Sequence, residues 1–335
     1  MLATDFKHMH AAHCESGVTA ALLGHAGLEL TEPLAFGLGG GLFFAYPPFA
    51  RVMGMPLISF RSYPGSLFGL TCKRLGVRME RRKFSTAEKG EAELDRLLAE
   101  GIPVGLQANM HWLSYFPREF RSQFNGHNLI ALAREGSEYL ISDPMLEEPV
   151  RIGVEALRRA RFAKGILAPK GVIYRPLQAP SDVDIRPALC KAIRATSRGM
   201  LVRFPIVGVR GIERLSRHIR RFPRTEPDEG RRRLLLGNIV RMQEEVGTGG
   251  AGFRFLYAAF LQEAADVMGH EPWHEASRRM TDVGDIWRGE FAGACGRVIK
   301  GRVDEITGTG EAADAVLKCS REEESIYRYL LANSP

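Results

Sequence analysis

Cys14 stands where a polar, histidine-rich opening gives way to an apolar repeat with helical spacing. Ser16 and Gly17 suit the first turn of a helix, and the repeat then follows at Val18, Ala21, Leu22 and His25. A thiol at that position meets unpaired backbone N–H groups and the positive end of the helix dipole, and both favour the thiolate. The pattern therefore predicts a reactive cysteine at the start of a helix.

Two later residues have the chemistry that such a cysteine requires, a base and a group that orients the base. His127 follows Asn125-Gly126 and opens an apolar stretch, 127–134. Asp143 ends the next apolar stretch, just before Pro144. If the two stretches form a hairpin, the Asp143 carboxylate can accept a hydrogen bond from the far ring nitrogen of His127. We predict that Cys14, His127 and Asp143 form one catalytic constellation.

The order of predicted elements indicates the fold class. A helix from the opening precedes a meandering group of strands, predicted at 57–63, 77–84, 104–110, 127–134, 138–142 and 171–174, with helices at 66–75, 91–100 and 154–162. This arrangement predicts an α+β layer fold of the papain-like cysteine peptidase type. A segment rich in Pro, Ser and Asp, 176–187, reads as a linker, and helical spacing dominates beyond it. We expect a catalytic domain over 1–178 and an all-helical domain over 179–335.

Positive charge is concentrated in the second half of the chain. Residues 186–233 hold 14 Arg or Lys against 4 Asp or Glu, within a net formal charge of +7 for all 335 residues. One helical stripe collects Arg210, Arg214, Arg217 and Arg221. The stripe suits a negatively charged partner, and nucleic acid, an anionic membrane and an acidic carrier protein all qualify on charge. Because no nucleic-acid motif accompanies it, nucleic acid is the weaker expectation.

Cysteine usage and hydropathy bear on the compartment. The five cysteines include no CxxC pair, which fits free thiols in a reducing environment. The polar opening lacks the apolar run of a secretory signal, so a cytoplasmic location is expected. The least charged stretch, 33–50, is interrupted by glycines and prolines. It predicts a buried glycine-rich crossing beneath the active site, and no membrane span.

Several features admit a second interpretation. Cys14 could be an inert buried thiol, and His8, His10, His13 and Cys14 have zinc-ligand chemistry without a standard zinc spacing, so no metal is expected. The stretch Gly247-x-Gly249-x-x-Gly252 matches a dinucleotide fingerprint but follows a predicted helix, which argues against that use. The aromatic loop 111–124 either walls a substrate channel, through Trp112, Tyr115 and Phe116, or tucks its rings into the core.

Blocks along nearly the whole chain resemble one known family. His13-Cys14-Glu15-Ser16, the stretch from Glu32-Pro33 to Gly41-Leu42, Gly126-His127-Asn128 and Ser142-Asp143-Pro144 resemble the N-terminal domain of the butirosin biosynthesis protein H family. The stretches 244–250 and 253–261 are similar to the helical domain that accompanies it. The first domain of that family is related to cysteine peptidases that trim bacteriocin leaders and use Cys, His and Asp in this chain order.

The resemblance implies a specific activity. The family's named member is an acyltransferase that takes an acyl group from the phosphopantetheine thioester of an acyl carrier protein and passes it to an amine of an aminoglycoside. Carried over by position, Cys14 is the nucleophile, His127 the base and Asp143 the orienting acid. No cofactor is expected, apart from the phosphopantetheine arm of the donor, and the arginine stripe becomes a docking site for the carrier protein.

The oxyanion donor departs from the related peptidases, which carry a glutamine several residues before the cysteine. This chain has His8 and His10 there, so the Cys14 N–H, with His8 or Gln107, is the expected donor. Asn109 stands near a strand end where related sequences are expected to have an acidic residue. A hydrolase with the same triad and a non-catalytic binding module remain alternative functions, and a homodimer is left open.

Overall fold

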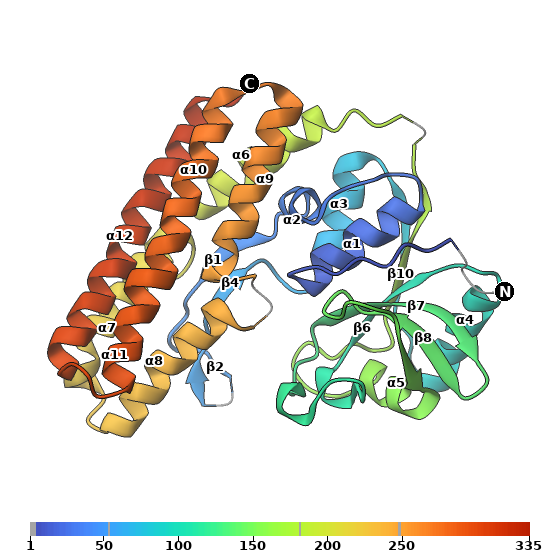
Figure 1. Cartoon of the computed structure of the whole chain (residues 1–335), viewed down its shortest axis with the longest axis horizontal. Coiled ribbons are helices and arrows are strands. Elements are labelled where there is room, and N and C mark those ends of the chain that lie inside the picture. Colours follow the sequence, from blue (N-terminus) through green and yellow to red (C-terminus); the bar gives the residue numbers. More distant parts are fainter. Residues whose placement is uncertain (1–4, 53, 181, 247–248) are drawn as a thin grey trace. The chain divides into compact units, whose positions relative to one another are not determined.

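The computed structural model describes residues 5–52, 54–180, 182–246 and 249–335, and the chain divides into two compact units (Figure 1). The sheet unit comprises residues 1–39 and 63–185, and the helical unit comprises 40–62 and 186–335. The contacts thus place the division at 185–186, whereas the sequence predicted 178–179. They also assign residues 40–62 to the helical unit, which the sequence placed in the catalytic domain.

The sheet unit is built from one antiparallel sheet and the helices that cover it. Its helices are α1 (Cys14–His25), α2 (Glu32–Leu38), α3 (Leu67–Leu75), α4 (Ala87–Ala99) and α5 (Val154–Arg161), with short 3₁₀ turns η1 (Met110–Trp112) and η2 (Arg118–Phe120). Its strands are β5 (Arg78–Arg82), β6 (Val104–Ala108), β7 (His127–Glu135), β8 (Glu138–Ser142), β9 (Val150–Gly153) and β10 (Ile173–Gln178).

The six strands lie in the order β5-β10-β6-β7-β8-β9, and every neighbouring pair is antiparallel. Helix α1 covers one face, whereas α4 and α5 cover the other (Figure 1). Leucines of α4 pack with Leu106 of β6 and Leu129 of β7 in one buried core cluster. Because both faces are covered, all five residues of β6 are buried, including the polar Gln107.

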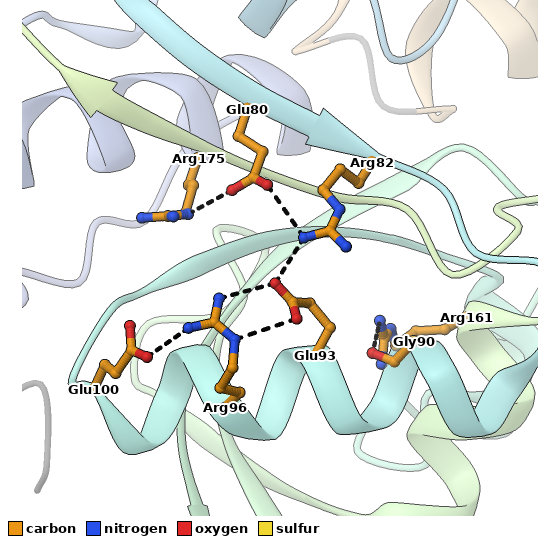
Figure 2. Close-up of polar contacts among 8 residues, drawn as sticks. All are labelled: Glu80, Arg82, Gly90, Glu93, Arg96, Glu100, Arg161 and Arg175. Carbon is orange, nitrogen blue, oxygen red and sulfur yellow. Dashed lines mark hydrogen bonds and ion pairs between the residues drawn. The ribbon is translucent and has the colours of Figure 1, made fainter.

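A chain of ion pairs fastens the edge strand β5 to its neighbours (Figure 2). Glu80 accepts from Arg175 of β10 at 3.0 Å, and Arg82 bridges across to Glu93 of α4 at 2.8 Å. Glu93 also pairs with Arg96 one turn later, at 2.9 Å. Charged side chains along an edge strand discourage pairing with other chains, so the network protects the edge as well as joining strand to helix.

The helical unit begins with short strands and continues as a set of packed helices. The strands are β1 (Leu42–Ala45), β2 (Arg51–Val52), β3 (Met55–Pro56) and β4 (Ser59–Arg61), paired as β1-β4 and β2-β3. The helices are α6 (Arg186–Met200), α7 (Gly208–Thr225), α8 (Glu229–Glu244), η3 (Ala251–Phe253), α9 (Arg254–Met268), α10 (Glu271–Asp285), the π-helical turn η4 (Ile286–Phe291), α11 (Ala292–Ile299) and α12 (Glu305–Ala332). Helix α12, the longest, packs against α7 and α10.

The predicted fold class is confirmed: one unit is α+β, with helices on an antiparallel sheet, and the other unit is largely helical. Two details of the prediction are wrong. Residues 32–38 form helix α2, and 42–45 form a strand of the helical unit, so 33–50 is not a glycine-rich crossing beneath the site. The spacing over 274–300 also predicts a single helix, which the π-helical turn at 286–291 interrupts.

Among the residues that the structure describes, no helix is both long enough and apolar enough to span a membrane.

Candidate active site

Cys14 is the first residue of α1, as the sequence predicts. His13 caps the helix, because its side chain accepts a hydrogen bond from the Ser16 N–H. The helix is buried from Cys14 to Leu23, the polar Glu15, Ser16 and Thr19 included, so it is a core element of the sheet unit. Only 6% of the Cys14 surface is exposed, and the thiol lies at the positive end of the helix dipole.

Glu32, at the start of α2, holds the backbone that leads into Cys14. Its Oε2 accepts from the Ala12 N–H at 2.9 Å, and its Oε1 accepts from the His13 N–H at 2.7 Å and from the Ser16 hydroxyl at 3.0 Å. Burial raises the pKa of Glu32, although these hydrogen bonds oppose the rise. This role of Glu32 was not predicted from the sequence. Thr31 followed by Glu32-Pro33 is typical of a helix start, and it was the pattern that could have indicated the role.

Gly17 lets α1 approach the end of β8. A Cβ at this position would stand 2.6 Å from Cβ of Ala11 and 2.8 Å from Cβ of Pro144, which is closer than side chains pack. The Ala11 N–H also donates to the Pro144 carbonyl at 2.8 Å. Because Pro144 follows Asp143, this contact sets the distance between the helix that carries the cysteine and the strand that carries the carboxylate.

His127 and Asp143 lie side by side, brought together by the β7–β8 hairpin. His127 is the first residue of β7, and Asp143 directly follows β8. The Nε2 atom of His127 lies 2.7 Å from Oδ2 of Asp143, and both side chains are buried. Because Asp143 holds Nε2, Nδ1 is the ring nitrogen left for a second partner, and the Cys14 thiol contributes to the raised pKa of His127.

The electrostatics of the site favour a charged imidazole. Burial alone would lower the pKa of His127, but the charges of Asp143 and Cys14, with the hydrogen bonds to both, raise it to about 10. The pKa of Asp143 is lowered: burial opposes ionisation, and His127 together with the donors to the carboxylate outweighs it. The site therefore suits an imidazolium held against the Asp143 carboxylate.

Tyr115 and Phe116 of the aromatic loop complete the surroundings of this pair. The Tyr115 hydroxyl donates to Oδ2 of Asp143 at 2.7 Å, and the Phe116 ring meets the His127 ring edge-on, with centroids 5.8 Å apart. Phe116 is buried in the core, so the loop does tuck a ring inward. The position of Tyr115 supports a role that the sequence analysis missed, which is to orient the carboxylate. Its predicted contact with substrate stays a prediction.

Trp112 has different neighbours from the other two aromatic residues. The Arg159 guanidinium lies over its ring, 5.4 Å from the centroid, and the His111 ring meets it edge-on. Its indole lines a cavity beside α5, together with Arg118 and Arg121. Tyr115 and Phe116 therefore lie against the His127–Asp143 pair, whereas Trp112 lines the cavity beside α5.

His8 and Gln107, the predicted side-chain donors for an oxyanion, have different surroundings. His8 must donate from Nε2 to the Leu146 carbonyl, at 3.0 Å, and its Nδ1 then accepts from the Ser142 hydroxyl at 2.8 Å. Both ring nitrogens of His8 therefore have partners, and its role at an oxyanion stays a prediction. Gln107 is buried on β6, opposite Asn128 of β7, and its role stays a prediction.

Asn109 has a structural environment of its own. Its Nδ2 donates to Oδ1 of Asn125 at 2.7 Å, and its Oδ1 accepts from the His111 N–H at 2.9 Å. The side chain is buried, so its amide braces the two ends of the aromatic loop. An auxiliary role of Asn109 in the chemistry stays a prediction.

The arginine stripe lies on α7 in the helical unit. Arg210, Arg217 and Arg221 are exposed, and Arg214 is half-buried. Arg210 pairs with Glu213 at 3.1 Å, whereas no ion pair of the other three is found within the described part of the chain. Arg214, Arg221 and Arg51 of β2 together lower the pKa of His218, after burial, which shows that their charges gather around that ring.

Neither alternative ligand site gains support. In the described ranges, no group of three or more His, Cys, Asp or Glu side chains is arranged to hold a metal ion. Gly247 and Thr248 of the glycine fingerprint lie outside the described residues, and the part that is described follows helix α8.

Two parts of the chain each match a known family. Residues 155–330, more than half of the chain, match the family described as a domain of unknown function, DUF4872. The chain belongs to this family. Residues 13–144 match the family described as butirosin biosynthesis protein H, N-terminal, so this part of the chain is similar to that domain. The match includes Cys14, His127 and Asp143 and ends at Pro144.

No protein of curated function matches the chain. Among solved structures, a crystal structure described as a C39-like peptidase from Bacillus anthracis is similar, with a TM-score of 0.37 and 16% sequence identity, over 53% of this chain and 98% of that one.

Proposed function

We propose that this chain is an acyltransferase that moves an acyl group from an acyl carrier protein, through a thioester on Cys14, to an amine. The observation that carries the proposal is the buried His127 held at Nε2 by Asp143, with its pKa raised by Asp143 and by Cys14, the first residue of α1. This is the arrangement of a nucleophile, a base and an orienting acid. The match to butirosin biosynthesis protein H supports a place in the biosynthesis of a specialised metabolite.

In the first half-reaction, the Cys14 thiolate attacks the carbonyl carbon of the donor thioester. A bond forms between Sγ and this carbon, the bond to the phosphopantetheine sulfur breaks, and the leaving thiolate takes the proton of the His127 imidazolium. With its pKa raised to about 10, the imidazolium is protonated at neutral pH and is ready for this transfer. The Cys14 N–H at the helix start is available to stabilise the oxyanion.

In the second half-reaction, the acceptor amine attacks the acyl-enzyme. The new C–N bond replaces the bond to Sγ, and the proton of the amine passes to the now neutral His127, which restores the original pair. Formation of an amide from a thioester makes this half-reaction favourable. Water in place of the amine would make the same site a hydrolase.

The exposed arginines of α7 fit the proposed donor. Arg217 and Arg221 present cationic side chains on one helix face, and an acidic carrier protein would be drawn to such a face. We expect Arg217→Glu and Arg221→Glu to weaken carrier binding at least tenfold in calorimetry. Arg328→Glu, on an exposed face of α12, is the matched control and should leave the affinity unchanged.

Intact-mass spectrometry after incubation with acyl-loaded carrier proteins tests the proposal. Wild type and Cys72→Ala should gain the mass of the acyl group, and Cys14→Ala should not. Cys72 is a suitable control because it lies buried in α3, where burial raises its thiol pKa to about 12. Adding an amine should then discharge the acyl group as an amide.

Two results would replace the proposal. An acyl-enzyme that decays at the same rate with and without amine indicates a hydrolase. A chain that gains no mass, and whose Cys14 is alkylated at neutral pH as slowly as a model thiol, is a binding module with an inert cysteine.

A further inference from the structure

A cavity of about 530 Å³ lies in the sheet unit, between the aromatic loop and the start of α5. Its volume falls within the range of small-ligand sites, about 300–1,000 Å³. The residues of its wall that matter here are His111, Trp112, Arg118, Arg121, Glu155 and Arg159. The His127–Asp143 pair is not part of this wall, so the cavity is a separate site.

The wall carries an excess of positive charge. Three guanidinium groups face a single carboxylate, Glu155, which is engaged by Arg159 at 3.0 Å. Arg121 is fixed in place, because it donates from Nε to the Phe116 carbonyl at 2.7 Å and also to the Ser114 carbonyl. Arg118 has no ion pair within the described part of the chain, so its charge is available to a ligand.

The N-terminus of α5 adds to this field. Glu155 and Ala156, in its first turn, contribute to the wall, and no side chain caps the helix. The first backbone N–H groups of a helix favour an anion, as does the positive end of its dipole. Guanidinium groups and a helix start thus point to the same class of ligand, and phosphate matches both.

The excess of positive charge is specific to the cavity beside α5, because a second cavity of similar size lacks it. The cavity of about 570 Å³ in the helical unit has both Glu229 and Glu305 in its wall, and these pair with Arg233 and Arg232. Acidic and basic groups are balanced there. The cavity beside α5 also offers an apolar surface, the Trp112 indole, which is 37% exposed.

We propose that the cavity beside α5 binds a phosphorylated small molecule with a flat ring, of the nucleoside diphosphate class. The phosphates lie against Arg118 and the start of α5, and the ring lies against Trp112, as aromatic side chains and guanidinium planes commonly receive such groups. The site is independent of the acyl-transfer proposal, since binding requires neither Cys14 nor His127.

Tryptophan fluorescence during titration with ADP tests the site directly. Of the three tryptophans, Trp273 and Trp287 are fully buried in the helical unit, so a ligand-dependent change reports on Trp112. We expect a saturable change with ADP, competition by inorganic pyrophosphate, and no saturable change with adenosine. Absence of a saturable change with ADP, or failure of pyrophosphate to compete, overturns the proposal.

Matched arginine variants separate this site from general attraction of anions. Arg118→Gln should raise the Kd for ADP at least tenfold, with an unchanged unfolding temperature as evidence of an intact fold. Arg151→Gln, an exposed residue on β9 paired with Glu135, should leave the Kd within twofold. Equal effects of the two substitutions would mean non-specific charge attraction and would overturn the proposal.

Discussion

His127 and Asp143 are joined by a buried contact, with Nε2 of the imidazole 2.7 Å from Oδ2 of the carboxylate. The contact fixes which ring nitrogen faces Cys14, and it raises the pKa of the imidazole, so geometry and charge at the site depend on one interaction.

Asp143→Asn should lower the pKa of His127 well below the value of about 10. The amide keeps the shape but removes the charge that opposes burial, so desolvation of the imidazolium then dominates. NMR titration of the imidazole measures the change directly. A titration midpoint equal to that of wild type would show that the carboxylate does not hold the proton.

The same substitution has a consequence for stability. The raised pKa means that folding stabilises the imidazolium, and this contribution is fully present below the usual pKa of 6.5. It is lost as pH rises through about 10. The free energy of unfolding should therefore fall across this window in wild type, and fall less steeply in Asp143→Asn. Urea denaturation at several pH values between these limits provides the measurement.

Tyr115→Phe should slow acylation of Cys14 by about tenfold, since one hydrogen bond to a charged group contributes about 1.5 kcal/mol. The loss acts through the orientation of Asp143, whose Oδ2 accepts from Tyr115. Tyr139→Phe is the matched control, because the Tyr139 hydroxyl donates to the Asp95 carboxylate at 2.6 Å, away from the site. Equal slowing in both variants would assign the effect to stability.

Gly17→Ala should reduce the reactivity of Cys14 and destabilise the sheet unit by about 1–3 kcal/mol. The added methyl group collides with Ala11 and Pro144 and forces α1 away from the strand that ends at Asp143. Gly24→Ala, later in the same helix, meets nothing within 4 Å and should be neutral or stabilising. Alkylation rates and urea denaturation of the two variants give the comparison, and similar results for both would remove Gly17 from the argument.

Much of the fold follows from local signals in the sequence. Apolar runs of strand length at 104–110, 127–134 and 138–142 become β6, β7 and β8, and the charged run at 77–84 becomes the edge strand β5. The helix beginning at Cys14 follows from its polar opening and apolar repeat. These elements were predictable because burial imposes a period on the side chains.

Other features depend on contacts between residues distant in the chain. Residues 40–62 join the helical unit through pairings such as Ala45 with Val207, which no local pattern encodes. The partners of His8, the Ser142 hydroxyl at the end of β8 and the Leu146 carbonyl beyond it, are distant in the chain, so its spacing from Cys14 could not indicate them. The support of Cys14 by Glu32 likewise arises from the packing of α2 against α1.

Arg254→Met should destabilise the helical unit by about 3–5 kcal/mol, because it leaves the buried Glu323 carboxylate without its cationic partner. Arg254 and Glu323 are fully buried and form a two-pronged ion pair, with nitrogen–oxygen distances of 3.0 and 2.9 Å. The Trp287 indole also donates to Glu323, at 3.1 Å. Loss of the guanidinium leaves one indole N–H and the Tyr327 hydroxyl against a carboxylate that water cannot reach.

The neighbouring residue on α12 is the control for this prediction. Glu324 forms a surface ion pair with Arg328 at 2.7 Å, one turn along the same helix. Because exposed pairs contribute little, Glu324→Gln should change the free energy of unfolding by no more than about 0.5 kcal/mol. Urea denaturation followed by far-ultraviolet circular dichroism compares the two. If Arg254→Met is as mild as Glu324→Gln, solvent or another cation must reach Glu323, and the packing of α9 against α12 is looser than these distances imply.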